Sequence, residues 1–368
     1  MIRLAWVIET FEAEFLAQYR HRLTSDHTRA LAAIKRCRTE VGPKLQVQCT
    51  GCEHRTLMPH SCGHRHCPHC QHHESQQWLE RQLKKQVPAE YFMLTFTLPA
   101  EFRALTRAHQ NVVYELLMRG AWETVHTFTQ HDKQLGGTPG AIAVLHTHTR
   151  QLDYHPHIHL VMPAAAVDRA GKRWRVKQCG KKRRYLFNHK ALAKVFRAKL
   201  LAGIEAAGLS LPARYPTAWV VDCKAVGTGE KALVYLGRYL YRGVIREQDI
   251  VAVTGTTVTF AYEDAKTKTT QRRTLSGADF LWRVLQHVLP KGFRRARNFG
   301  FLHPNCKRLI ALLHWLLKVV PRAAGAWFKA RPPILCPCCG APMKIVQTRL
   351  RTEFPKTIPV PIMMAQVR

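Results

Sequence analysis

The 368-residue sequence is poor in acidic residues and has no long apolar run, and both absences exclude classes of protein. No stretch reaches the ~20 uninterrupted apolar residues of a membrane span, and the opening residues soon reach Glu9, Glu12 and Glu14, which predicts no signal peptide. Asp and Glu number 24 against 57 Lys and Arg, a net charge of +33. Because the cations are spread along a globular chain, we expect a cytoplasmic protein that binds nucleic acid and no membrane.

The twelve cysteines, without a secretion signal, indicate reduced thiols and metal sites rather than disulfides. Two C-x2-C knuckles, Cys49 to Cys52 and Cys67 to Cys70, are separated by 14 residues, close to the spacing of a four-thiolate zinc ribbon. Two further thiols and several histidines lie nearby, so a second zinc ion and the division of ligands stay open. The thiols predicted to hold structural zinc are Cys49, Cys52, Cys67, Cys70, Cys37 and Cys62.

A third C-x2-C knuckle, Cys336 to Cys339, lies near the end of the sequence and has no second knuckle after it. Three interpretations stay open for this knuckle: Cys306 supplies a missing ligand, His303 supplies it, or the knuckle holds no metal.

Residues 154–162 carry three alternating histidines, His155, His157 and His159, in an otherwise apolar run. The two-residue period of a strand puts all three on one face. Residues 141–149 predict a preceding strand, and the short connection predicts an antiparallel hairpin. A suitable register would turn His146 and His148 toward His157 and His159, which makes a metal site. The alternative is a histidine-rich surface strand without metal.

Residues 230–241 predict a helix that carries a pair of tyrosines. Tyr235 and Tyr239 stand at i and i+4, so their hydroxyls project from one face, whereas Tyr241 lies on another. Packing or stacking is the alternative role for such a pair. We also expect helices over 4–36, 71–86, 109–131, 188–207, 277–288 and 309–320, and strands over 91–98, 219–226, 251–253 and 256–262.

Two basic segments are candidates for contact with nucleic acid. Residues 169–184 hold nine Lys and Arg with Trp174, and residues 291–300 interleave cations with aromatic rings as a single-strand platform would. A solvated loop is the alternative for the first segment. The cations predicted to contact nucleic acid are Arg238, Arg242, Lys181, Lys182, Arg183, Arg184, Arg294 and Arg295.

In this order, the zinc cluster, the histidine strand and the tyrosine helix resemble the two-tyrosine rolling-circle transposases of the IS91 group. That group belongs to the HUH single-strand endonuclease superfamily, and the resemblance covers about residues 30–345. The most specific segments are Ser61 to Cys70, Phe96 to Pro99, His155 to His159, and Tyr235 to Tyr239.

The resemblance implies an α+β fold, with an HUH nuclease domain whose central antiparallel sheet is flanked by helices, and an N-terminal zinc-binding domain. The expected domains are a helical lead-in (1–36), a zinc-binding domain (37–88), a catalytic domain (89–250), a basic region with a knuckle (251–345) and a disordered tail (346–368).

The resemblance further implies that Tyr235 or Tyr239 attacks DNA to give a 5′-phosphotyrosine and a free 3′-hydroxyl. A catalytic Mg²⁺ or Mn²⁺ would be held by His157, His159 and a third ligand, for which we favour His146 over His148 and His155. One or two structural Zn²⁺ complete the expected cofactors.

The expected partners are single-stranded DNA of the transposon ends and target, in the bacterial cytoplasm and nucleoid. Because no helicase motif occurs, a host helicase or the replication machinery would unwind the DNA. The alternative function is a non-catalytic zinc-ribbon regulator that binds DNA or RNA. A zinc hydrolase is disfavoured because no carboxylate base stands near the histidines in the sequence.

Overall fold

The computed structural model describes residues 1–168, 170, 172–179, 185–241, 243–264, 266–320 and 332–350. The chain divides into two compact units. Residues 1–34 and 63–330 form the large unit, and residues 35–62 and 331–368 form the small unit. No helix of the described residues is long and apolar enough to cross a membrane.

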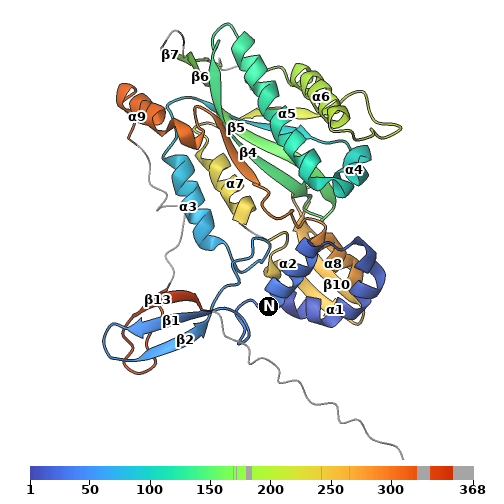
Figure 1. Ribbon diagram of the computed structural model, residues 1–368, viewed down its shortest axis with the longest axis vertical. Coiled ribbons are helices and arrows are strands. Elements are labelled where there is room, and N and C mark those ends of the chain that lie inside the picture. The colour runs from blue at the N-terminus through green and yellow to red at the C-terminus, as the bar shows by residue number, and fades with distance from the viewer. Residues whose placement is uncertain are drawn as a thin grey trace, which may run out of the picture. The chain divides into compact units, whose positions relative to one another are not determined.

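The large unit is built on an antiparallel sheet in the order β7-β6-β4-β5-β3-β8, with β12 also paired to β4. This sheet and its flanking helices confirm the expected α+β class. The hairpin predicted at 141–162 is β4 and β5, at the centre of the sheet (Figure 1). The strands are β3 (Tyr91–Thr97), β4 (Thr138–His148), β5 (Tyr154–Pro163), β6 (Ala165–Asp168), β7 (Arg173–Val176), β8 (Val221–Ala225) and β12 (Ala296–Gly300).

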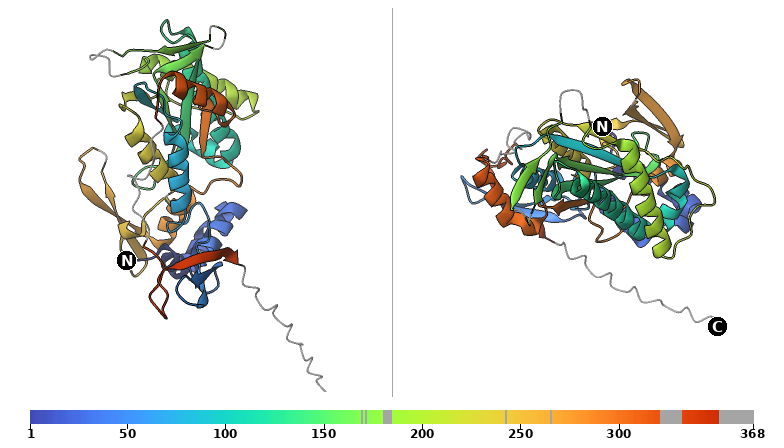
Figure 2. Two further views of the ribbon diagram at one scale, coloured as in Figure 1. Left: turned by 90° about the vertical axis from the view of Figure 1, so that its left-hand side faces the viewer. Right: turned by 90° about the horizontal axis from the view of Figure 1, so that it is seen from above.

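Helices cover both faces of this sheet, because its buried strands are apolar on both sides. On one face, Ala143 and Leu145 of β4 join the main core beneath α5 and α6. On the other face, Ile142 and Val144 join a second core with α3 and α7. Figures 1 and 2 show the two layers of helices. The helices are α3 (His72–Leu83), α4 (Arg103–Ala108), α5 (Gln110–His131), α6 (His189–Ala206), α7 (Glu230–Tyr241) and α9 (Lys307–Leu316).

The rest of the large unit is a helical group on a small antiparallel sheet in the order β11-β10-β9. Helix α1 packs on α8, where Tyr19 stacks on Trp282 with ring centroids 5.2 Å apart. The elements are α1 (Leu4–Tyr19), α2 (Ser25–Lys35), α8 (Gly277–Leu285), β9 (Ile250–Thr254), β10 (Thr257–Glu263) and β11 (Thr270–Ser276). Short 3-10 turns lie at Arg20–Arg22, Ala100–Phe102, Glu247–Asp249 and Pro304–Cys306.

The small unit is a three-stranded antiparallel sheet in the order β13-β1-β2. Its strands are β1 (Lys44–Cys49), β2 (Arg55–Pro59) and β13 (Met343–Leu350). The disordered tail expected from residue 346 was wrong at its start, because residues 346–350 complete β13 on the edge of β1. Residues 351–368 lie outside the described residues. Residues 63–88, which we grouped with the first knuckle, belong to the large unit, where α3 packs on α7.

Candidate active site

Three histidines meet on the face of the sheet that α7 covers. The register of β4 with β5 sets His146 opposite His157, and His159 follows on the same face. The ring centroid of His146 lies 5.1 Å from that of His157 and 4.2 Å from that of His159. One nitrogen from each ring lies within 4.8 Å of the others. The structure therefore brings together the three histidines that we favoured as ligands.

The two other candidate histidines of the hairpin lie outside this group. His155 contacts the guanidinium of Arg103, whose Nη2 is 3.2 Å from its Nδ1. His148 stacks on Tyr239 at 4.9 Å between centroids and meets His287 edge-on at 5.4 Å. His148 therefore packs beside the tyrosine rather than completing the three-histidine group.

Burial keeps the three imidazoles neutral. Desolvation lowers the pKa of His157 to about 3 and that of His159 to about 4, and it holds the pKa of His146 well below its usual range. The neighbouring histidines lower the pKa values of His146 and His157 further. At neutral pH each ring therefore offers a lone pair, which is the form that binds a metal ion.

The hydrogen bonds of these rings fit a bound cation. His157 directs Nδ1 to the backbone oxygen of His155 at 2.7 Å, which leaves Nε2 as the acceptor. His159 Nδ1 lies 3.4 Å from Sδ of Met93. His146 Nε2 is buried and meets no hydrogen-bond partner within the described part of the chain. Because an unsatisfied buried nitrogen is costly, a cation at this point would stabilise the site.

Helix α7 brings Tyr239 onto the histidines. Its ring stacks on His146 with centroids 3.3 Å apart and an interplanar angle of 3°. The backbone N–H of Thr147 donates to the Tyr239 hydroxyl at 3.1 Å. The guanidinium carbon of Arg295 lies 4.4 Å from the centre of the same ring. A hydrogen-bond donor and a cation thus surround the tyrosine that lies nearest to His146.

Tyr235 lies one helical turn earlier and is more open. Its ring centroid is 6.0 Å from that of His146 and 5.9 Å from that of His159, and 47% of the residue is exposed. Partial burial and the neighbouring Tyr239 raise its pKa, whereas Arg150 lowers it. The two tyrosines therefore lie on the same face of α7, but Tyr235 is farther from His146 than Tyr239 is.

The glycine between the two tyrosines has a packing role. A Cβ on Gly237 would lie 3.3 Å from the ring of Trp78, so glycine lets α7 approach α3 closely. Ser75 of α3 donates to the Gly237 carbonyl at 3.1 Å. Tyr241, on another face of the helix, packs against the second core.

A pocket of about 780 Å³ opens beside the two tyrosines. It lies between α7, the turn after β4 and the β9–β11 sheet, and its walls include Lys231, Arg150, Arg238 and Tyr262. Of these, only Arg238 was predicted from the sequence. Lys231 stands four residues before Tyr235, so helical periodicity could have identified it. No local pattern brings Tyr262 here, because β10 is distant in the chain.

The cysteines group differently from the sequence prediction. One sulfur from each of Cys49, Cys52, Cys336 and Cys339 lies within 4.8 Å of the other three, and all four belong to the small unit. The sequence left the division of the ligands open, and spacing along the chain cannot detect a partner as distant as the last knuckle. The third knuckle faces Cys49 and Cys52 rather than Cys306 or His303. The remaining predicted thiols are Cys37 and Cys62 of the small unit and Cys67 and Cys70 of the large unit.

Comparison with known proteins gives a consistent family. A family model described as "Transposase zinc-binding domain", of the IS91 type, matches residues 7–98, and one described as "Putative transposase" matches residues 140–309. A Sinorhizobium fredii protein described as "Putative transposase y4qJ" is 32% identical over 320 residues, which cover 79% of each chain. The chain belongs to the IS91 group of transposases.

A second relative of this transposase is the transposase for insertion sequence element IS801 of Pseudomonas savastanoi pv. phaseolicola. It is 29% identical over 335 residues, which cover 80% of this chain and 78% of the relative. Among solved structures, the conjugative relaxase TrwC in complex with mutant oriT DNA aligns with 36% of this chain and 49% of its own. The identity is 22% and the TM-score is 0.25, a likeness too weak to carry an argument.

The basic segments of the transposase have separate outcomes. Arg242 and residues 181–184 lie outside the described residues. The aromatic platform expected at 291–300 was wrong, because Phe293 is buried in the main core and Phe299 packs against that core. The chain there becomes β12, and Phe299 of this strand pairs with Ala141 of β4 at the core.

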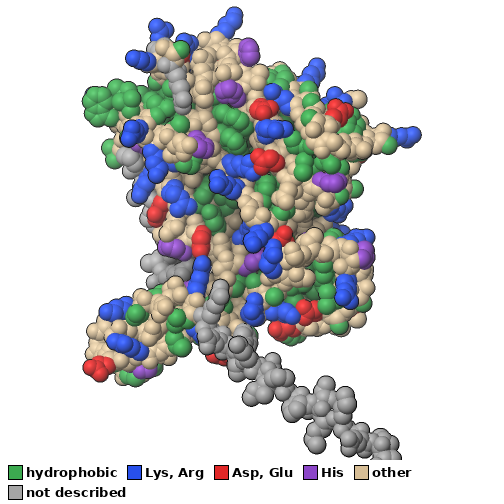
Figure 3. Space-filling view, in the orientation of Figure 1, with side chains coloured by type: hydrophobic (Ala, Val, Ile, Leu, Met, Phe, Trp, Pro, Cys, Tyr) green, Lys and Arg blue, Asp and Glu red, His purple; other side chains and the backbone are tan. Residues whose placement is uncertain are grey.

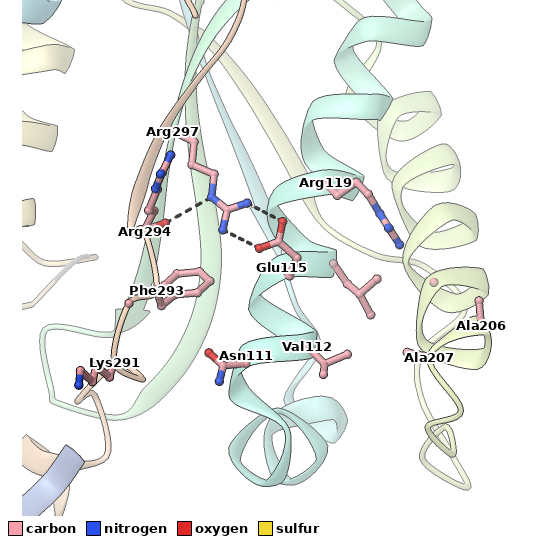
Figure 4. Close-up of a pocket in the computed structure, with 13 residues that line it drawn as sticks. Asn111, Val112, Glu115, Arg119, Ala206, Ala207, Lys291, Phe293, Arg294 and Arg297 are labelled. Atoms are coloured by element: carbon pink, nitrogen blue, oxygen red, sulfur yellow. Dashed lines mark hydrogen bonds and ion pairs between the residues drawn. The ribbon is translucent and has the colours of Figure 1, made fainter. Parts of the chain in front are cut away.

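Arg294 lines a second pocket of about 880 Å³, on the opposite face of the sheet from the tyrosines. Figure 4 shows this pocket between α5, α6 and the segment that leads into β12. Arg297 holds Glu115 there with two hydrogen bonds of 2.5 and 2.6 Å. Arg294 is therefore remote from the tyrosine site, whereas Arg295 contacts Tyr239 directly.

Proposed function

We propose that this transposase cuts and rejoins single-stranded DNA at the ends of its element, with Tyr235 and Tyr239 as nucleophiles, as an enzyme of the HUH class. The observation that carries this proposal is the stacking of Tyr239 on His146, one of three convergent neutral imidazoles. Such a site combines a nucleophile with ligands for a cation, and a phosphodiester needs both.

The surroundings of Tyr239 suit attack on phosphorus. As its proton leaves to solvent, negative charge develops on the phenol oxygen, and the Thr147 N–H and the Arg295 guanidinium stabilise that charge. A bond forms between the tyrosine oxygen and phosphorus, and the bond from phosphorus to the 3′ oxygen breaks. The freed 3′ oxygen takes up a proton, so the products are a 5′-phosphotyrosine and a 3′-hydroxyl.

His146, His157 and His159 would hold the catalytic cation. When bound, such an ion polarises the scissile phosphate and offsets the charge that develops on it. Resemblance to the family favours Mg²⁺ or Mn²⁺, although three imidazoles also suit softer ions. The fold contributes by keeping the three imidazole rings neutral, oriented and largely shielded from water.

The pocket beside the tyrosines offers a path for the strand. Lys231 and Arg238 supply positive charge for phosphates, whereas Arg150 pairs with Glu263 of the same pocket. Tyr262 offers a ring on which a base can stack. The positive charge of the surface also suits the binding of DNA, since Lys and Arg side chains are scattered over the face that Figure 3 shows. With two tyrosines on one helix face, one can hold the donor strand while the other receives the target strand.

The test is covalent capture of DNA. The protein is incubated with Mn²⁺ and single-stranded oligonucleotides that tile the DNA flanking its gene, and adducts are resolved by denaturing electrophoresis and mass spectrometry. We expect an adduct on Tyr239 or Tyr235 that is absent from Tyr235→Phe/Tyr239→Phe and from His157→Ala/His159→Ala. The matched control is Tyr241→Phe on the same helix, which should cut normally.

Two outcomes would overturn the proposal. An adduct that persists in the double tyrosine variant would exclude these nucleophiles. Metal-independent retention of DNA without any adduct or cut would favour the alternative, a non-catalytic zinc-containing regulator.

A further inference from the structure

We propose that Cys49, Cys52, Cys336 and Cys339 bind one zinc ion, which joins the first knuckle to the last and completes the zinc-binding domain with a C-terminal segment. The family model for that domain ends at residue 98, so two of the four ligands lie outside it. The proposal does not depend on the proposed chemistry of the tyrosines.

The sulfur positions match a tetrahedral thiolate site. The Sγ atom of Cys339 lies 3.4 Å from that of Cys49 and 3.6 Å from that of Cys52, and Cys52 lies 3.7 Å from Cys336. With Zn–S bonds of about 2.3 Å, a regular tetrahedron separates its sulfurs by about 3.8 Å. Cys338 is exposed and is no member of the group, although it is a neighbour in sequence.

The backbones of the two knuckles are shaped alike around these sulfurs. The N–H of Gly51 donates to Cys49 Sγ at 3.2 Å, and the N–H of Cys338 donates to Cys336 Sγ at 3.4 Å. In each knuckle the donor stands two residues after the first cysteine, and such donors stabilise a thiolate. The two halves therefore present equivalent pairs of ligands.

Glycine allows the knuckles to approach each other. A Cβ on Gly51 would lie 2.8 Å from Cβ of Ala341 and 3.6 Å from Sγ of Cys339. The backbone fastens the same contact, since the N–H of Thr50 donates to the carbonyl of Pro342 at 3.1 Å. Strand β13 then continues alongside β1 (Figure 1).

The small unit buries few apolar side chains among its described residues. Its buried cluster consists of Leu45, Val47, Cys49, Cys336 and Met343, so two of its members are proposed ligands. A core of this size does not sustain a fold, and zinc binding would supply the missing free energy. The domain is then discontinuous in sequence, and the catalytic segment is inserted between its two halves.

The test counts zinc in the full-length protein, purified under reducing conditions, by elemental mass spectrometry. We expect Cys49→Ser, Cys336→Ser and the combined variant each to lose the same single equivalent relative to wild type, because the two residues share one ion. Cys338→Ser is the matched control and should keep its full content. Replacement by Co²⁺ should give the strong visible absorption of a tetrahedral thiolate site, weaker in Cys336→Ser than in Cys338→Ser.

Two results would overturn the shared site. Loss of two equivalents in the combined variant would place the two knuckles on separate ions. Full zinc content in Cys336→Ser would show that the last knuckle holds no metal. If a variant aggregates, cobalt titration of the wild type and of Cys338→Ser still decides. An absorption too weak for a four-thiolate site in both proteins would exclude the shared site.

Discussion

The three histidines of the candidate active site lie on one hairpin, whereas the four grouped cysteines come from knuckles whose facing residues are 284 and 290 positions apart. The histidines sit on a sheet whose other face carries the main apolar core. The cysteines belong to a small unit, where two of them, Cys49 and Cys336, are part of a small buried apolar cluster. A large core can offset the cost of burying polar groups at a reactive surface, whereas a unit with a small core would depend on a bound metal for its stability.

This difference predicts that the two groups hold their metal ions with different strength. The histidine group should exchange its ion readily, because neutral nitrogen ligands bind Mg²⁺ or Mn²⁺ weakly. The thiolate group should hold zinc through brief treatment with a chelator and release it only when a mercurial blocks the sulfurs.

The largest effect should therefore come from removal of the catalytic ion. Brief exposure to EDTA should abolish DNA cleavage completely while it leaves the zinc content and the circular dichroism unchanged, and added Mn²⁺ should restore cleavage. Parallel assays of cleavage and zinc content check this. Treatment with a mercurial should release zinc and reduce the strand signal. Loss of zinc and of activity in the same step of EDTA treatment would contradict the comparison.

Next in size is the variant His157→Ala/His159→Ala. We expect cleavage to fall by about 10³-fold, as when a preorganised electrostatic element is removed. Unfolding free energy should change by no more than about 2 kcal/mol, because the sheet keeps its main core. Single-turnover cleavage and thermal unfolding measure the two effects.

The matched control for that variant is Cys49→Ser/Cys52→Ser. This variant should lose zinc and the small contribution of the small unit to the thermal unfolding signal, while the thermal unfolding transition of the large unit stays unchanged. A large unit that unfolds in the histidine variant would show that the histidines support the fold rather than the chemistry.

The contrast also explains what the sequence could and could not predict. The histidine hairpin and the tyrosine helix follow from periods of two and four residues, which are local. The partners of Cys49 could not be found in this way, because β1 meets β13 only through the folded chain. The platform predicted at residues 291–300 was wrong for a similar reason. The basic and aromatic pattern of this segment does not reveal that part of it forms a strand paired with β4. Local periodicity placed histidines on one face of a strand, and the resemblance to the family favoured His146 as the third candidate ligand. Neither could detect a cysteine group that distant segments assemble.

Within the candidate active site, the two tyrosines should differ in role because their surroundings differ. Tyr239→Phe should lower the rate of the first cleavage by about 10²-fold, because it loses the oxygen that Thr147 and Arg295 stabilise. Tyr235→Phe should lower it less than about tenfold and act mainly on the later transfer of the strand. Single-turnover cleavage and joining assays separate the two steps, and equal losses in the first step would contradict this order.

The smallest effect should distinguish the two faces of the sheet. Arg238 lines the pocket beside the tyrosines, whereas Arg294 lines the pocket on the opposite face (Figure 4). If DNA follows the first pocket, Arg238→Gln should lower the slope of log affinity against log salt by about 1 and weaken cleavage. Arg294→Gln, which removes the same charge, should leave both nearly unchanged. Titrations of a single-stranded oligonucleotide at several salt concentrations measure this slope, and a larger change for Arg294→Gln would place the strand on the other face.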